Sequence, residues 1–305
     1  MQDVFDSIII GAGPAGLTTA IYLARFNRKT LVIDKNSGRS SYLQVNENYL
    51  GFPEGIHAHK LRDLGKIQAE KFGTLFVDDE IMKIKKIENL FEVSSLENKF
   101  FAKSLVLATG VVDIFPAIPR VKSYFGISLF WCITCDGYKT QDKKVIILGH
   151  TDDAVVTCLQ FLTYTKKLIF LLNCDIESAA ISQRMKDRLE EHNIPYNEGV
   201  IEEFIGDNGH ISEVVLKGGN RLSADYVFSE QGASPNSVLA KELDVKTDAN
   251  GYIYVTKEQR TNVPFIYAAG DVTRIHSHQV VTAAHEGSQA AQSANYDLYE
   301  PFQKD

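Results

Sequence analysis

Ser7-Ile8-Ile9-Ile10-Gly11-Ala12-Gly13-Pro14-Ala15-Gly16 stands near the start of the chain and decides its fold. The apolar run 7–10 is typical of a buried parallel strand, and the stretch 17–26 after the glycines has a helical pattern. Strand, GxGxxG turn and helix in this order are typical of a dinucleotide-binding unit. Gly11 permits the tight turn, Gly13 lets a pyrophosphate approach the backbone, and Gly16 lets helix and strand pack closely.

The residues around this turn strengthen the prediction. Pro14 and Ala15 lie at the start of the helix, whose free N–H groups and partial positive charge favour phosphates. The next predicted strand, 30–33, ends at Asp34, about 20 residues beyond the glycines, where an acid is expected to bind the adenosine ribose. A glycine turn alone is a weak signal because many turns match it. With both strands and the acid in place, the signal is strong.

Trp131-Cys132-Ile133-Thr134-Cys135-Asp136, near the middle of the chain, contains the second motif. Cys132 and Cys135 can close a small disulfide ring and cycle between dithiol and disulfide. Asp136 is a candidate to move protons on and off the departing thiolate. Half a zinc site and two unrelated core cysteines are the alternatives, but Cys158 and Cys174 are lone residues that provide no second ligand pair. The motif favours redox chemistry, and we expect no metal site.

Length and composition limit the class of protein. The chain has 305 residues, 44% of them apolar and 23% charged, which suits a soluble globular protein of two domains. Its net charge of −7 argues against a nucleic-acid partner. No apolar run approaches the roughly 18 residues of a membrane helix, and the first residues lack a signal-peptide pattern. With so few cysteines, we expect a cytoplasmic protein.

Further strands indicate which dinucleotide is bound. The apolar strand 104–107 runs into Ala108-Thr109-Gly110, and the strand 265–268 is followed by Gly270-Asp271. Together with the N-terminal fingerprint, these segments resemble the two-domain FAD-dependent disulfide reductases. The resemblance implies that Asp271 holds the ribityl chain of FAD and that the helix from about Val280 points at the flavin ring. The residues assigned to the cofactor are then Gly11, Gly13, Pro14, Ala15, Gly16, Asp34, Thr109, Gly110, Gly270, Asp271, Gln279 and Val280.

The remaining segments define the predicted architecture. Residues 36–60 are interpreted as a loop along the flavin, and 72–101 as strands of a small antiparallel sheet. Linkers are predicted at 115–119 and 232–236, on either side of a second βαβ unit that begins with the strand 144–148. We therefore expect an α/β fold of two Rossmann-like three-layer domains. The FAD-binding domain is discontinuous, formed by residues 1–116 and 241–305, and residues 117–240 form an inserted, NADPH-domain-like domain that carries the CxxC.

With the CxxC at the start of this insert, the chain resembles the low-molecular-weight thioredoxin reductases over its whole length. By this resemblance, Cys135 faces the flavin, Cys132 attacks a thioredoxin-type protein, and Asp136 donates and accepts the proton. The resemblance also implies a homodimer and an inserted domain that rotates between a flavin-facing and a substrate-facing state, with the two linkers as hinges. No nucleic-acid or membrane partner is expected.

The second glycine turn departs from the family pattern. Thr151 replaces the middle glycine of GxGxxA, and Asp152 and Asp153 place negative charge where a pyrophosphate should lie. The stretch 171–177, where the family carries arginines for a 2′-phosphate, contains acids but no Arg or Lys. The closest resemblance is therefore to the thioredoxin reductase-like flavoproteins that lack NADPH motifs. Some of those proteins take electrons from ferredoxin.

Three other functions stay open at this point. They are an NADPH-dependent thioredoxin reductase with a divergent site, a flavin dithiol oxidase that passes electrons to oxygen, and a flavin-bound redox sensor without turnover. Near the carboxyl end, His276, His278 and His285 are interpreted as flavin-lining or dimer-contact groups. His285 or Glu286 is a candidate to lie near the flavin ring. The aromatic residues of the tail, Tyr296, Tyr299 and Phe302, are interpreted as packing residues, or alternatively as a stack on the flavin face.

Overall fold

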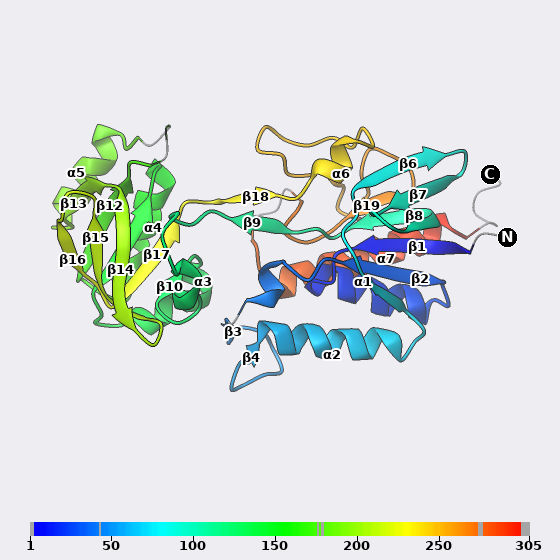
Figure 1. Cartoon of the computed structure of the whole chain (residues 1–305), viewed down its shortest axis with the longest axis horizontal. Helices are drawn as coiled ribbons and strands as arrows, with labels where there is room; N and C mark the ends of the chain where they lie inside the picture. Colours follow the sequence, from blue (N-terminus) through cyan, green and yellow to red (C-terminus); the bar gives the residue numbers. More distant parts are fainter. Residues whose placement is uncertain (1–2, 43, 176, 178–179, 274–276, 300–305) are drawn as a thin grey trace.

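The larger sheet is built from both ends of the chain. The computed structural model describes residues 3–42, 44–175, 177, 180–273 and 277–299. β1 (Val4–Ile10) lies between β2 (Thr30–Asp34) and β8 (Lys99–Leu107), and all three strands are parallel. β5 (Leu75–Asp78) pairs in parallel with β2, and β19 (Ile266–Ala268) pairs in parallel with β8. The amino- and carboxyl-terminal segments therefore form one nucleotide-binding sheet (Figure 1).

The antiparallel strands extend this same sheet. β7 (Leu90–Ser94) pairs antiparallel with the first half of β8, and β6 (Lys83–Ile87) pairs with β7. The antiparallel strands predicted within residues 72–101 are therefore confirmed for β6, β7 and the start of β8, but they belong to the larger sheet, and β5 pairs in parallel with β2. β8 pairs antiparallel with β7 through its first residues and parallel with β1 over most of its length. This one strand therefore joins the antiparallel part of the sheet to the parallel part.

Helices cover one face of this sheet. α1 (Pro14–Arg25) packs closely on α7 (Val280–Asp297), because a Cβ on Gly287 would lie only 2.2 Å from the carbonyl oxygen of Ala15. Thr19 Oγ1 also donates to the Gly287 carbonyl at 3.0 Å. Beside them lies α2 (Ala58–Glu70), which the sequence did not predict and which begins inside the expected 36–60 loop (Figure 1). The loop prediction is wrong from Ala58 onward.

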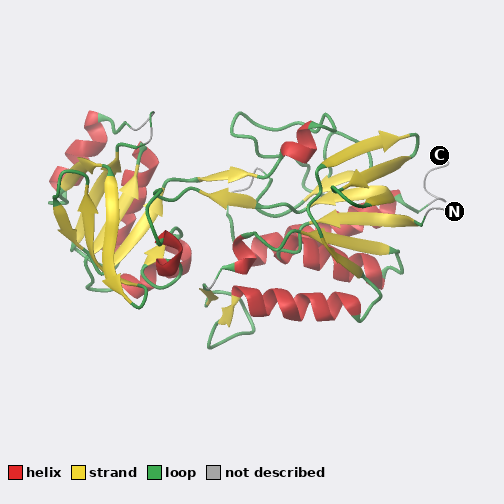
Figure 2. Cartoon of the chain, in the orientation of Figure 1, coloured by secondary structure: helices red, strands yellow, loops and turns green. Residues whose placement is uncertain are grey.

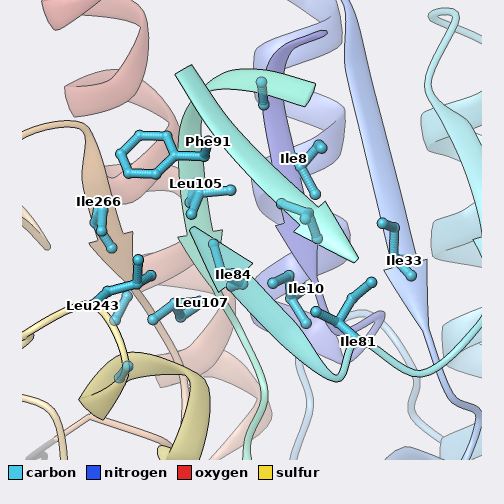
Figure 3. Packing of buried hydrophobic residues seen from close by; sticks show 14 of the residues in the cluster. Ile8, Ile10, Ile33, Ile81, Ile84, Phe91, Leu105, Leu107, Leu243 and Ile266 are labelled. Atoms are coloured by element: carbon cyan, nitrogen blue, oxygen red, sulfur yellow. The ribbon is translucent and has the colours of Figure 1, made fainter. Parts of the chain in front are cut away.

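Alternation along the strands gives the sheet two buried faces. Ile8 and Ile10 of β1 pack with Leu105, Ile84 and Phe91 on one face, where Figure 3 shows their side chains converging. Ile9 points to the opposite face, in the cluster with the apolar residues of α1 and α7. Successive side chains of a strand point to opposite faces, so a strand that is buried on both faces is apolar throughout. The rigid sheet fixes the loops at its carboxyl edge.

The second sheet belongs to the middle of the chain. It is parallel, in the order β10 (Leu129–Phe130), β17 (Tyr226–Glu230), β11 (Val145–Gly149), β12 (Leu168–Asn173) and β13 (Tyr196–Gly199). α4 (Asp152–Gln160) and α5 (Gln183–Glu191) share a core cluster with one face. The other face packs with the antiparallel sheet of β14 (Ile201–Asp207), β15 (His210–Leu216) and β16 (Arg221–Ser223). The result is a three-layer arrangement.

A narrow ribbon joins the two bodies. β9 (Val111–Asp113) and β18 (Ala233–Pro235) pair antiparallel and cross from one body to the other (Figures 1 and 2). β18 lies within the predicted linker 232–236, whereas β9 ends just before the predicted linker 115–119. The shorter elements are η1 (Arg39–Ser41), β3 (Val45–Asn46), β4 (Ile56–His57), η2 (Val121–Tyr124), α3 (Ile133–Asp136), η3 (Gly137–Thr140), η4 (Phe161–Thr163) and α6 (Val238–Lys241). Within the described ranges, no helix has the length and apolar character required to cross a membrane.

Candidate active site

The first glycine turn connects β1 to α1 at the carboxyl edge of the larger sheet. Gly11 has a φ of +107°, and a Cβ there would lie 2.3 Å from the carbonyl oxygen of Ala108. A Cβ on Gly16 would lie 1.9 Å from the carbonyl oxygen of Gly11. Both positions therefore require glycine. A Cβ on Gly13 would meet only Ser40 Oγ, at 3.7 Å, so the protein itself leaves room at this position.

Asp34 ends β2 beside this turn. Its Oδ1 accepts a hydrogen bond from the Ala12 backbone N–H at 3.0 Å, and its Oδ2 accepts one from Asn36 N–H at 3.1 Å. Arg62 of α2 places Nη1 3.8 Å from Asp34 Oδ2. The carboxylate thus braces the glycine turn. The contribution of Arg62 was missed because α2 itself was not predicted.

The opposite wall forms where β8 and β19 end. Arg39 donates from Nη1 to Asp271 Oδ2 at 2.8 Å and from Nε to Asp113 Oδ2 at 2.9 Å. A guanidinium held between carboxylates has a fixed orientation, so it also fixes Asp271. Gly270 N–H donates to Glu286 Oε2 at 2.8 Å. Burial raises the pKa of Glu286 to about 7, against the opposing effect of this hydrogen bond.

Thr109 connects this wall to the return linker. Its Oγ1 donates to the backbone carbonyl of Asn236 at 2.7 Å, and Asn236 Nδ2 donates to the Thr109 carbonyl at 2.9 Å. The two residues therefore exchange a pair of hydrogen bonds across the base of the ribbon. Gly110 follows with a φ of +64°, in the left-handed region that favours glycine.

A single large cavity runs between these walls and has a volume of about 1230 Å³. The predicted cofactor residues that line it are Gly11, Gly13, Pro14, Ala15, Asp34, Thr109, Gly110, Gly270, Asp271, Gln279 and Val280. Gly16 and Asp136 are not among the lining residues; Gly16 instead packs against the Gly11 carbonyl. Within the described chain, the Gln44 Oε1 atom of this lining is buried without a hydrogen-bond partner. The cavity therefore offers an acceptor that only a bound group can satisfy.

The CxxC faces the same cavity. Cys132 and Cys135 form a disulfide with a Cα–Cα distance of 5.3 Å, and both line the cavity. Cys132 flanks the short helix α3, and its Sγ accepts a hydrogen bond from the Cys135 backbone N–H at 3.1 Å. Gln279 of the larger domain reaches both sulfurs with its side-chain amide. The structure thus brings the redox motif to the nucleotide-binding turn across more than 100 residues of sequence.

Asp136 lies in a cluster of charges that spans both bodies. Lys139 Nζ is 2.9 Å from Asp136 Oδ1 and 2.8 Å from Glu47 Oε2, and Tyr138 OH also donates to Glu47. Burial raises the pKa of Asp136, Lys139 counteracts it, and the charge of Glu47 raises it further. The net effect is an elevated pKa, which suits a carboxyl that holds a proton for transfer. Sequence reasoning missed Lys139 and Glu47, because no local pattern links them.

A further carboxyl, Glu230, lines the cavity from the inserted sheet. It ends β17 opposite Gly149 of β11. Burial raises the pKa of Glu230 to about 7. Nothing in the local pattern of β17 indicated this role, because an acid at the end of a strand is usually solvated.

The raised pKa of Glu230 should make stability depend on pH. The folded chain holds this proton up to about pH 7, whereas an unfolded glutamate loses it near its ordinary value of 4.5. Because the folded state then binds more protons, the free energy of unfolding should fall between these pH values, by on the order of 3 kcal/mol from this group. In Glu230→Gln the fall should be correspondingly smaller in urea unfolding at successive pH values. An unchanged pH slope, matching that of the exposed control Glu190→Gln, would contradict this assignment.

The second glycine turn, at residues 149–154, has the tight shape of a nucleotide-binding turn but carries negative charge. A Cβ on Gly149 would lie 2.2 Å from Ala154 Cβ, so the turn is as tight as a nucleotide-binding turn. Asp152 and Asp153 occupy the first turn of α4, and Asp152 Oδ1 accepts a hydrogen bond from Ser182 N–H at 2.8 Å. Acids at a helix N-terminus stabilise the helix itself but repel a phosphate. The chain thus places two carboxylates in the first turn of α4, next to this turn.

Of the histidines and aromatic residues near the carboxyl end, some line the cavity and others do not. His278 lines it, whereas His285 is exposed and is absent from the lining, so of the pair 285–286 only Glu286 reaches the site, through Gly270. Tyr296, near the end of α7, and Tyr299, just beyond it, are half-exposed; at 1.5 Å per residue Tyr296 is about 26 Å along the helix from Gln279. Neither lines the cavity. His276 and Phe302 fall outside the described residues.

The remaining cysteines take no part in this site. Cys158 is buried and burial raises its pKa to about 12, while Cys174 is exposed after β12. Among the residues that the structure describes, no group of three His, Cys, Asp or Glu side chains is placed to hold a metal ion.

Comparison with known proteins gives the same picture for the whole chain. A family model described as pyridine nucleotide-disulphide oxidoreductase matches residues 5–291. The thioredoxin reductase of Treponema pallidum (strain Nichols) is 32% identical over 303 residues, covering 96% of this chain and 97% of that protein. The crystal structure of thioredoxin reductase from Streptococcus pyogenes MGAS5005 has a TM-score of 0.90 at 26% identity, covering 98% of this chain and 100% of that one.

A second solved structure superimposes less well on this chain. Lactococcus lactis thioredoxin reductase in the FR conformation is 27% identical and covers 97% of this chain and 99% of its own, but its TM-score is only 0.63. The predicted α/β fold with two Rossmann-like domains is confirmed by the similarity to the Streptococcus structure. The chain belongs to the pyridine nucleotide-disulphide oxidoreductase family and, within it, to the low-molecular-weight thioredoxin reductases.

Proposed function

We propose that this oxidoreductase passes electrons from FAD through the Cys132–Cys135 disulfide to a thioredoxin-type protein, and that its electron donor is not NADPH. The observation that carries the proposal is the shared cavity: the disulfide and the dinucleotide-binding turn line the same space. Electrons can move directly only between groups that meet, and this cavity brings the flavin site and the disulfide together. Ferredoxin is the donor that we favour.

The cavity fits FAD, the cofactor of this family. Gly11 and Gly13 leave the backbone open to a pyrophosphate at the start of α1, Asp34 lies at the ribose end, and Asp271 is held for the ribityl chain. The unpaired Gln44 acceptor suits a ring N–H. When bound, FAD supplies the two-electron carrier that the side chains lack.

The side chains then handle sulfur and protons. Two electrons break the S–S bond. With a single proton taken up, one sulfur becomes a thiol and the other a thiolate. We assign the attack on the partner's disulfide to Cys132, which forms a mixed disulfide with one partner sulfur while the other leaves and takes up a proton as the partner's first thiol. Cys135 then attacks Cys132 Sγ and restores the original disulfide, which releases the partner's second thiol. Asp136, with its raised pKa, is the group that we propose donates and accepts the proton.

We propose that the inserted domain, residues 117–240, turns relative to the FAD domain, residues 1–116 and 241–305. The disulfide is partly buried and faces the cavity proposed for FAD, so a movement would make it more accessible to a protein partner. The ribbon of β9 and β18 is the candidate hinge. The low TM-score of the Lactococcus structure in its FR conformation, at almost full coverage, supports a second arrangement of the same two parts. We expect a homodimer.

The charges at the second glycine turn support a donor other than NADPH. Asp152 and Asp153 face the place of a pyrophosphate, and Asp175 follows β12 where a 2′-phosphate would need cations. Ala180 also lies against this turn, because its N–H donates to the His150 carbonyl. Each feature opposes a phosphorylated nucleotide.

Anaerobic reduction tests the donor. NADPH, NADH and reduced ferredoxin are added in separate cuvettes, and the flavin absorbance is followed. We expect ferredoxin to bleach the flavin and each nucleotide to act at least about 100-fold more slowly, since binding lost through more than one misplaced charge costs several kcal/mol. Rapid bleaching by NADPH would contradict the proposal.

A gain of function provides the control for this experiment. The triple variant Thr151→Gly, Asp152→Ala, Asp153→Ala restores the glycine and removes both charges at the turn. Reduction by NADPH should become faster in this variant than in the parent protein, while reduction by ferredoxin stays unchanged. If removal of the charges changes nothing, another feature of the inserted domain excludes NADPH.

A further inference from the structure

We infer that Gln279 is a catalytic hydrogen-bond donor to the sulfurs of the CxxC, that Asn48 positions it, and that this donor acts only while the disulfide faces the cavity. The inference rests on the proposed electron transfer through Cys132 and Cys135. It gives Gln279, predicted as a cofactor residue, a direct role at the reacting atoms.

The geometry of the Gln279 amide fits both sulfurs. Gln279 immediately precedes α7, and its Nε2 lies 3.4 Å from Cys132 Sγ and 3.4 Å from Cys135 Sγ. The two bonded sulfurs lie side by side as seen from this nitrogen, so one N–H of the side-chain amide can point between them and be shared by both. The side chain is half-buried, which strengthens such contacts relative to the same contacts in water.

Asn48 determines which end of the amide faces the sulfurs. Its Nδ2 donates to Gln279 Oε1 at 2.9 Å. Because Oε1 accepts this hydrogen bond, the amide is turned with its N–H groups toward the disulfide. Asn48 is exposed and lies in the loop between β3 and β4. Among the described residues it makes no hydrogen bond to either cysteine, so it acts on the sulfurs only through Gln279.

The donor favours the reduced state over the disulfide. A neutral disulfide sulfur is a weak acceptor, whereas a thiolate is charged, and hydrogen bonds to charged acceptors are about twice as strong. Reduction by two electrons and one proton creates one thiol and one thiolate, so the Gln279 N–H groups stabilise the charge where it appears. Gln279 Oε1 is also 3.7 Å from Cys135 Sγ, a contact that can carry a hydrogen once this sulfur is a thiol.

The donor and the sulfurs belong to different parts of the molecule. Gln279 precedes α7, which covers the larger sheet, and Asn48 lies between β3 and β4 next to α2, whereas Cys132 and Cys135 lie in the inserted part. Any turn of the inserted part away from the cavity removes the amide from the sulfurs. The thiolate then becomes more basic, and a more basic thiolate is the better nucleophile toward a disulfide. The thiolate is thus stabilised while it forms and activated when it meets the partner.

Thiol alkylation at different pH values tests this inference without donor or partner protein. The holoenzyme with Cys174→Ser, which removes the exposed free thiol, is reduced anaerobically with dithiothreitol and freed of it. It is then treated with iodoacetamide between about pH 5 and 9, and modified Cys132 and Cys135 are counted by peptide mass spectrometry. Gln279→Leu should raise the pH midpoint of alkylation by about one unit, a tenfold lower thiolate fraction below the midpoint.

Two further variants complete the test. Asn48→Leu should shift the midpoint in the same direction by a smaller amount, and because Asn48 is exposed this variant should fold and keep its flavin. Gln292→Leu, on the exposed side of the same helix, should leave the midpoint unchanged. Unshifted midpoints in both Gln279→Leu and Asn48→Leu overturn the inference. A shifted midpoint in a protein that fails to reduce thioredoxin would instead contradict the proposed function alone.

Discussion

Replacement of Cys135 by serine should lower the rate of electron transfer to thioredoxin by at least about 10³-fold, because a hydroxyl cannot form the disulfide that carries the electrons. The FAD content should stay normal, since Cys135 lies in the inserted part of the chain, far in sequence from the glycine turn. Cys132→Ser should cause a loss of the same size. A single-turnover measurement avoids the question of the donor: the enzyme is reduced with dithionite, mixed anaerobically with oxidised thioredoxin, and followed by flavin reoxidation.

Cys174→Ser is the matched control, because it removes an exposed sulfur that the structure leaves free. Its rate should equal that of the parent protein. A Cys135→Ser variant that retained a tenth of the rate would show that electrons bypass the disulfide. A parent protein with no turnover would favour the redox sensor, and oxygen uptake with a small dithiol would favour the oxidase.

The largest effect on folding should come from Gly16→Ala. Its Cβ would lie 1.9 Å from the Gly11 carbonyl oxygen, which is backbone and cannot move without displacing β1 or α1. We expect a destabilisation of several kcal/mol and little soluble yellow protein, since a clash with backbone is a strong form of overpacking. Gly13→Ala should behave differently, because its Cβ would meet only Ser40 Oγ at an ordinary 3.7 Å.

The comparison of these variants separates folding from cofactor binding. In Gly13→Ala the apoprotein should unfold at nearly the parent temperature, while the affinity for FAD falls at least about tenfold, or 1.4 kcal/mol. The measurements are thermal unfolding of the apoprotein and a titration of it with FAD. Unchanged FAD affinity in Gly13→Ala would mean that the pyrophosphate does not approach this position. A stable Gly16→Ala protein would mean that the helix can move away from the strand.

The nucleotide-binding core was predictable from sequence because its signals are local. Strand, glycine turn, helix and acid follow one another within Ser7–Asp34, and each has a physical reason that does not depend on the rest of the chain. The helix α2 was missed because its signals are weak: His57 at its start is not a favoured capping residue, and Ala58 and Ala69 are its only buried side chains among those described. A weak periodic pattern is nevertheless present, because Ala58, Leu61, Gly65 and Ala69 follow the i, i+3, i+7, i+11 spacing of a helix.

The polar contacts of the site were not predictable for a different reason. Lys139 meets Glu47, and Gln279 meets both cysteines, across separations of roughly 90 to 150 residues that no spacing rule covers. The pairing direction of β5, at the edge of the larger sheet, could not be predicted either. β5 was assigned to an antiparallel sheet from its alternation, but pairing direction depends on which strand lies beside it, and here that strand is β2.

The position of Lys139 between two carboxylates has a thermodynamic consequence. The charge of Glu47 raises the pKa of Asp136, and it can do so only while the two parts of the molecule are together. By reciprocity, a proton on Asp136 must favour the arrangement in which the two parts are in contact to the same extent. A neutral Asp136 no longer repels Glu47 and no longer competes with it for Lys139. Loss of that proton weakens this arrangement. Under the proposed movement, proton uptake by Asp136 and domain position are linked equilibria, so the proposed proton carrier would also be an allosteric effector of the movement.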